Sequence, residues 1–247
     1  MSVATILMLV LGAAAGGFVN GLAGTGTALF ALGFYLLVLD AVTAVAVVAT
    51  MSVITGLQGL WLVRRAIRAQ PRRLARFLVP GLVGVPLGIL LLSFLDATTL
   101  RIGIAVFLVT YGAYFSFRAA LPRFETPTPI LDGAIGFVGG VLGGAASVSG
   151  ALPAMYLSLR PWPKAETRAV LQPYNVAILG STVALLALRG AYDARAMTAL
   201  LVTVPTGLVA AQVGIFVFRR LTDDLFRRLL IGLTLVLGAG ILLQELT

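Results

Sequence analysis

Apolar positions form long runs that are separated by short clusters of arginine, proline and acidic residues. The first run extends from Val3 to Leu39, and a similar run in the second half extends from Ile130 to Leu159. Because one membrane-spanning helix needs about 20 residues, each run predicts two short helices in a hairpin. Small and hydroxyl-bearing residues interrupt the runs at Gly24–Thr27 and at Ser147–Gly150, where we place two helix breaks.

The other apolar runs each have the length of one spanning helix. They are Ala41–Val63, Phe77–Leu95, Thr99–Phe117, Ala169–Leu188, Ala196–Phe218 and Leu225–Leu243. The polar segments Arg64–Arg76 and Arg160–Arg168 are expected to be loops. The pattern predicts an all-α polytopic membrane protein, in which each half has a broken or re-entrant helical hairpin followed by three transmembrane helices.

The two halves resemble each other, which predicts repeats at residues 1–118 and 130–247, joined by a proline-containing linker at 119–129. Near the start of each half, Gly17-Phe18-Val19 with Gly21 and Gly24 matches Gly136-Phe137-Val138 with Gly140 and Gly143. Later matches share one constant offset: Gly81, Gly88, Leu95, Arg101 and Gly112 match Gly207, Gly214, Leu221, Arg227 and Gly238.

The arginines decide the relative orientation of the halves, because cytoplasmic loops are enriched in Lys and Arg. If each long run is one span, the halves are parallel and 10 of the 18 basic residues are cytoplasmic. If each run is a hairpin, the halves are inverted and 15 of the 18 are cytoplasmic. We therefore expect two inverted-topology repeats in the cell inner membrane, with the Arg64–Arg76 segment in the cytoplasm and both termini outside.

Composition supports a membrane protein and excludes several kinds of chemistry. Hydrophobic residues make up 60% of the chain and charged residues only 11%, against about a quarter in soluble domains. The chain contains no cysteine and no histidine, so we expect no enzyme, no catalytic residue, no cofactor and no metal site. The net charge of +9 comes from arginines between apolar spans, so we expect lipid and no nucleic acid as a partner. Homo-oligomerisation stays open.

The breaks have the chemistry of an anion site. A helix that begins within the membrane exposes unpaired backbone N–H groups, and its dipole adds about half a positive charge there. Thr25 or Thr27 is expected to cap the helix after the first break, and Ser149 the helix after the second, with Pro153 in its first turn. Asn20, one turn before the first break, needs a polar partner in this apolar setting.

The spans after the hairpins add polar residues. Arg168, Gln172 and Asn175 are spaced to share one face of a helix, where a guanidinium and two amides suit an oxyanion. Thr50, Ser52, Thr55 and Gln58 lie on the span of the first half. The candidate substrate-binding residues are Asn20, Gly24, Thr25, Gly26, Thr27, Thr50, Ser52, Ser147, Ser149, Gly150, Arg168, Gln172 and Asn175.

Each feature also has a plainer interpretation. Glycines let membrane helices pack closely, as expected for Gly12, Gly16 and Gly17. Arg168 can mark a cytoplasmic helix start and extend to water, and Thr50 and Ser52 can bond back to their own helix.

Carboxylates occur only near the ends of the predicted spans, at positions such as Asp40, Asp132 and Glu166. A cation carrier or an intramembrane proton relay would need them nearer the middle. This distribution favours an anion as the substrate.

The run Gly17 to Thr27, the Ala49-Thr50-Met51-Ser52 segment and the repeated Gly81 and Gly88 spans resemble the TauE/SafE family of sulfite exporters and sulfonate permeases. The resemblance covers nearly the whole chain. The chain has Phe30 where a proline is common in the family, and Ala169 to Gln172 where an Ala-Thr-Ser-like run is usual. The resemblance implies a cofactor-free inner-membrane carrier of small sulfur oxyanions or organic sulfonates, with its site at the breaks and the Thr50 and Gln172 helices.

We therefore expect an exporter of sulfite or an organosulfonate that works by alternating access around the two breaks. The alternatives are an uptake permease for another small anion and a channel-like or scaffold protein.

Overall fold

The computed structural model describes residues 2–94, residues 125–246 and the single positions 102, 106, 109, 110 and 113. These residues form helices and contain no strand. The helices are α1 (Val3–Ala23), α2 (Thr27–Leu36), α3 (Ala41–Ala69), α4 (Pro71–Phe94), α6 (Pro129–Ala146), α7 (Ala151–Ser158), α8 (Lys164–Leu188), α9 (Ala194–Arg220) and α10 (Asp223–Leu246). The arginines at 101, 118 and 123, the residues matched at Leu95 and Gly112, and most of the span predicted at 99–117 and of the linker at 119–129 lie outside the described residues.

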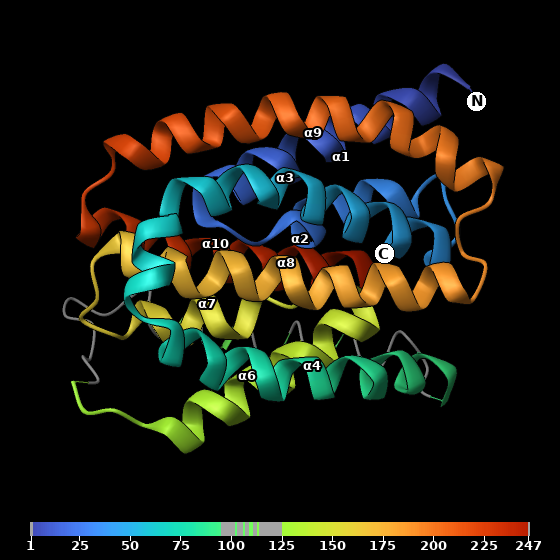
Figure 1. Ribbon diagram of the computed structural model, residues 1–247. Coiled ribbons are helices and arrows are strands. Elements are labelled where there is room, and N and C mark those ends of the chain that lie inside the picture. Colours follow the sequence, from blue (N-terminus) through green and yellow to red (C-terminus); the bar gives the residue numbers. More distant parts are fainter. Residues whose placement is uncertain are drawn as a thin grey trace.

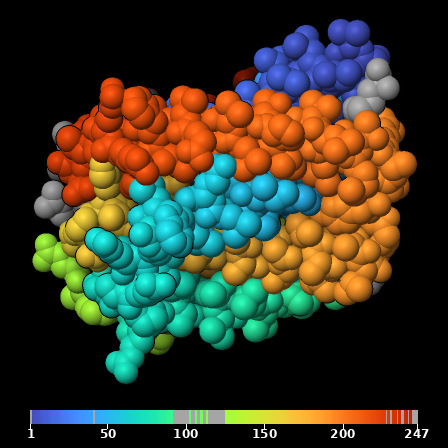
Figure 2. Space-filling model, turned by 45° about the horizontal axis from the view of Figure 1, so that its top comes forward, coloured from blue at the N-terminus to red at the C-terminus, as the bar shows by residue number. Residues whose placement is uncertain are grey.

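Six of the described helices are long and apolar enough to cross a bilayer: α1, α3, α4, α6, α8 and α9. Large apolar side chains such as Val79, Val83, Leu201 and Val209 are exposed on α4 and α9, which both reach the face seen in Figure 2. Apolar surface of this kind needs a lipid environment. The protein is a multi-pass membrane protein, as its composition predicts.

Helices of the first half pack mainly against helices of the second half. α1 lies along α9 and α4 lies along α6, on opposite sides of a central α3–α8 pair (Figure 1). The contacts are close, since an added Cβ at Gly17 would run into the backbone of Gly207, and one at Gly140 into the backbone of Gly81. Small residues that bring membrane helices together therefore explain Gly17, as the packing interpretation predicts.

The repeat register taken from the first glycine motif is wrong by about one helical turn. α1 ends in a left-handed residue at Gly24 and α6 at Ser147, so the equivalent of Gly24 is Ser147 rather than Gly143. The packing agrees, because an added Cβ at Gly17 would meet Gly207 first, whereas one at Gly140 would meet Gly81 first and one at Gly136 would meet Phe77 first. Glycines recur about once per turn on the packed face of α6, so a local glycine match does not fix how the two halves align in sequence. The inverted orientation of the halves stays a prediction.

The helix ends gather at two ends of the molecule. Arg73 pairs with Glu166, and the backbone N–H of Lys164 donates to Asp223, so the α3–α4, α7–α8 and α9–α10 connections meet. We call this end, at Gln70, residues 159–163 and residues 221–222, the basic end. At the opposite end, Arg195 donates to the carbonyl oxygen of Val38, which joins residues 37–40 to residues 189–193 (Figure 1).

Two expected loops are largely helical. α3 continues to Ala69 and α4 begins at Pro71, so only Gln70 separates them. α8 begins at Lys164, which places Arg168 in a helix. Arginine is a good helix former and proline is tolerated in the first turn, so a polar segment here extends the helices rather than ending them.

Candidate functional site

Both predicted breaks are present. In the first, Gly24 has φ 83° and Gly26 has φ 96°, a left-handed conformation that glycine adopts freely, and the chain turns from α1 into α2 within three residues. In the second, Ser147 has φ 57° and ends α6, and α7 begins at Ala151. Ser147 is the only non-glycine residue with positive φ in the described part of the chain, a strained conformation that is typical of functional sites.

The predicted side-chain caps are wrong. The residues that precede α2 and α7 are Gly26 and Gly150, and no described side chain caps either helix. The left-handed turn leaves Thr25 and Ser149 facing other helices instead. Pro153 lies in the first turn of α7 as predicted. The amide ends of both half-helices are thus left without a protein cap within the described residues.

The two breaks touch each other. A Cβ added to Gly150 would overlap the side chain of Thr25, so these residues are in direct contact. Asn175 on α8 links them, since its Oδ1 accepts from Ser149 Oγ at 2.6 Å and from Thr25 Oγ1 at 3.4 Å. Residues about 125 positions apart in sequence therefore form one buried cluster, and Thr25, Ser149 and Asn175 are at most 5% exposed.

Arg168 lies on α8 two turns from Asn175, towards the basic end, and is fully buried. Its Nη1 donates to the carbonyl oxygen of Leu22 at 3.2 Å, and its Nε donates to Oε1 of Gln172 at 3.1 Å. Gln172 in turn donates to the carbonyl oxygen of Gly56 at 3.0 Å. Arg168 is 0% exposed, so it does not extend to water as the plainer interpretation holds. It also places a full positive charge against the carbonyl end of α1, which carries partial negative charge.

Asn20 finds its partners on α3. Its Nδ2 donates to Thr55 Oγ1 at 2.7 Å and to the carbonyl oxygen of Ser52 at 3.1 Å. The end of α1 is thus hydrogen-bonded to both α3 and α8. Gln172 of α8 also donates to the carbonyl oxygen of Gly56, the residue after Thr55, so α3 and α8 are joined at the same level.

Two candidates lie apart from this cluster. Thr50 donates to Ala46 of its own helix and bonds Tyr192 at 2.7 Å near the opposite end, as the plainer interpretation of Thr50 holds. Burial raises the pKa of Tyr192 above its usual range. Ser147 Oγ donates to the carbonyl oxygen of Val45 at 3.3 Å. The structure brings the other predicted residues together: Asn20, Gly24, Thr25, Gly26, Thr27, Ser52, Ser149, Gly150, Arg168, Gln172 and Asn175.

The cluster contains buried polar atoms that have no hydrogen-bond partner within the described residues. Two are donors, Nη2 of Arg168 and Nδ2 of Asn175, two are the hydroxyls of Thr27 and Ser52, and one is an acceptor, Oδ1 of Asn20. Leaving such a group unpaired costs about 1–3 kcal/mol, and native proteins keep few of them. Their concentration around the two breaks is the pattern of a site that a polar ligand completes.

The cluster suits an anion rather than a cation. The buried carboxylate of Asp132 lies near the basic end, where it accepts from Tyr156 at 2.7 Å and pairs with Arg160. No described residues form a group of acidic side chains that could hold a metal ion. The amide ends of α2 and α7 add partial positive charge at the breaks, and the carbonyl ends of α1 and α6 add partial negative charge. The full charge of the buried Arg168 therefore decides the sign, and it favours an anion.

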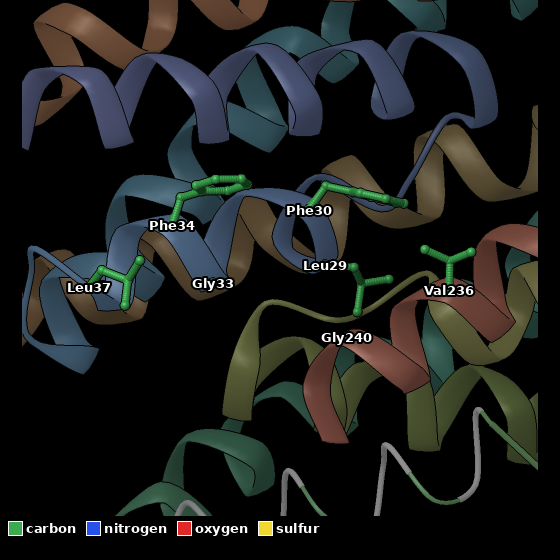
Figure 3. A pocket seen from close by; sticks show the side chains of 7 residues that line it. All are labelled: Leu29, Phe30, Gly33, Phe34, Leu37, Val236 and Gly240. Atoms are coloured by element: carbon green, nitrogen blue, oxygen red, sulfur yellow. The ribbon is translucent and has the colours of Figure 1, made fainter. Parts of the chain in front are cut away.

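A separate apolar pocket of about 250 Å³ lies between α2 and α10. Figure 3 shows Phe30 and Phe34 of α2 on one side and Val236 and Gly240 of α10 on the other. Its lining offers no charged or hydrogen-bonding side chain. It is therefore not the anion site, although α2 forms part of both.

Two contributors to the site were missed from the sequence. Thr55 was noted only as one of several polar residues, yet it is the hydrogen-bond partner of Asn20; its place three residues after Ser52 was the available signal. Phe218, whose ring lies 4.4 Å from the guanidinium carbon of Arg168, carries no sequence signal, because an aromatic residue near a helix end is ordinary.

A family model described as "Sulfite exporter TauE/SafE" matches residues 8–241. No curated protein and no solved structure matches the chain significantly.

Proposed function

The chain belongs to the TauE/SafE sulfite exporter family and is a membrane transporter, and we propose that it exports sulfite or a small organosulfonate through the cluster at the two helix breaks. The observation that carries this proposal is the contact of Thr25 with Gly150 beside a buried Arg168 whose Nη2 has no partner among the described residues. A small oxyanion supplies the acceptors that these donors lack.

Transport is proposed to follow alternating access. α1 with α2 and α6 with α7 are the broken elements, and each packs on a helix of the other half. Rocking of one half against the other would expose the same cluster to each side in turn, a mechanism that recurs in carriers with interrupted helices. For a monovalent anion that leaves a cell, the membrane potential supplies about 2.3 kcal/mol per 100 mV, so export needs no coupling ion.

A flux measurement tests the substrate class. Purified protein in liposomes is expected to move sulfite and short sulfonates faster than empty liposomes do, and to generate a potential that a permeant cation relieves. Flux equal to that of empty liposomes across several sulfur oxyanions would remove this substrate class.

We propose that the basic end faces the cytoplasm. The helix bounds place Arg64, Arg65, Arg68, Arg72, Arg73, Arg76, Arg160, Lys164, Arg219 and Arg220 near this end, and Arg189 and Arg195 at the opposite end. An excess of Lys and Arg marks the cytoplasmic side.

Single cysteines test this orientation cleanly, because the chain has none of its own. We expect Ala69→Cys and Asp223→Cys to react with a membrane-impermeant thiol reagent only from the cytoplasm, and Arg189→Cys only from outside. The three positions are exposed at the helix ends. Labelling of all three from one side would contradict the inverted topology.

A further inference from the structure

The ring of Phe218 lies close to two cations. Lys164 and Arg168 stand one turn apart on α8, and their side chains lie 5.1 Å and 4.4 Å from the centroid of this one ring on α9. The ring is 4% exposed, and Phe226 of α10 packs against it edge-on at 5.3 Å. Both cations can therefore interact with the π electrons of the same side chain.

The two cations differ in their access to water. Lys164 is partly exposed at the basic end, where its Nζ donates to the carbonyl oxygens of Phe218, Arg219 and Leu221 at the end of α9. Arg168 is fully buried and belongs to the anion cluster. Phe218 thus contacts both the partly exposed Lys164 and the buried Arg168 of α8.

We propose that Phe218 is the gate on the basic-end side of the anion path, and that Lys164 is the outer cation that receives the anion. The proposal rests on the proposed function for the identity of the anion. In the structure the π face of Phe218 lies beside both Lys164 and Arg168. An oxyanion binds these cations more strongly than a ring does, so it displaces the ring as it passes from one to the other.

This arrangement predicts that the gate needs an aromatic residue at position 218. An aliphatic side chain fills space but offers the cations no negative face, and it would not compete with the anion. Phe226 provides a matched control, because it is buried in the same aromatic pair and makes no cation–π contact with Lys164 or Arg168 within the described residues.

The first experiment measures access and does not depend on the substrate. Gln172→Cys places a thiol one turn beyond Arg168, in a chain without other cysteines. Its labelling by the anionic reagent sulfonatoethyl methanethiosulfonate from the basic end is expected to be about tenfold faster with Phe218→Leu and unchanged with Phe226→Leu. Equal labelling rates in the Phe218→Leu and Phe226→Leu backgrounds would overturn the gate.

The second experiment separates gating from folding. In liposomes, Phe218→Leu is expected to lower the KM for the transported anion about tenfold, because the anion no longer competes with a ring. Lys164→Gln is expected to raise KM with little change in kcat. A purely structural role of Phe218 would lower the amount of folded protein and leave KM unchanged. If no sulfur oxyanion is transported but labelling of the Gln172→Cys thiol still accelerates, the substrate class fails and the gate stands.

Discussion

Replacement of Arg168 by glutamine is expected to abolish transport while the protein stays folded. The guanidinium is the one full charge that the structure places in the cluster, and its Nη2 has no partner in the described part of the chain. A hydrogen bond to a charged group is worth about 1.5–3 kcal/mol, and the loss of two such bonds to a bound anion lowers kcat/KM by roughly 100-fold or more. The measurement is sulfite flux into or out of liposomes.

The same substitution is expected to change stability little. Glutamine gives up the bonds to Leu22 and to Gln172, but it also removes a buried charge that is only partly paired, and these two effects oppose each other. In wild-type protein, sulfite at 100 times its Kd is expected to stabilise the fold by about 2.7 kcal/mol, which raises Tm. This ligand-dependent rise should vanish in Arg168→Gln while Tm without ligand stays within a few degrees.

Two further variants define the role of Arg168. Arg168→Lys keeps the charge but cannot donate to two separated oxygens in a fixed plane, so about tenfold loss of transport is expected. Arg189→Gln removes an exposed arginine from the opposite end of the same helix and is expected to transport normally. Normal sulfite transport by Arg168→Gln would show that this guanidinium only pins α1 to α8.

The sequence predicted the breaks because run length and small residues are local signals. A run too long for one span must turn, and Gly24 and Gly26 mark the place where a left-handed backbone is needed. Helical spacing likewise placed Arg168, Gln172 and Asn175 on one face, and all three are buried. The family assignment, made from the same glycine motifs, is confirmed by the match over residues 8–241.

Tertiary contacts account for what sequence reasoning got wrong or missed. The half-helices follow Gly26 and Gly150 without side-chain caps, because Thr25 and Ser149 bond to Asn175 of another helix instead. The register of the glycine contacts depends on how α1 packs against α9 and how α6 packs against α4. No local sequence pattern encodes this packing. Phe218 gains its significance only from two cations on a neighbouring helix.

Gly150→Ala is expected to reduce transport at least tenfold, because its methyl group would overlap Thr25 and force the two breaks apart. Overpacking of this kind costs about 1–3 kcal/mol, which here acts on the contact that closes the site. Gly180→Ala is the matched control: it lies on α8, no described atom comes within 4 Å of its added Cβ, and it should transport normally.

A second substitution distinguishes loss of this contact from general damage to the fold. Thr25→Gly removes every atom that the new methyl group would meet first, so the double variant Gly150→Ala/Thr25→Gly should recover part of the transport that Gly150→Ala loses. The recovery is partial because the hydroxyl that donates to Asn175 is also gone. A double-mutant cycle on flux should then give a coupling of about 1–3 kcal/mol between the two positions. Additive losses would mean that the breaks act independently, and a single anion held between them would no longer account for transport.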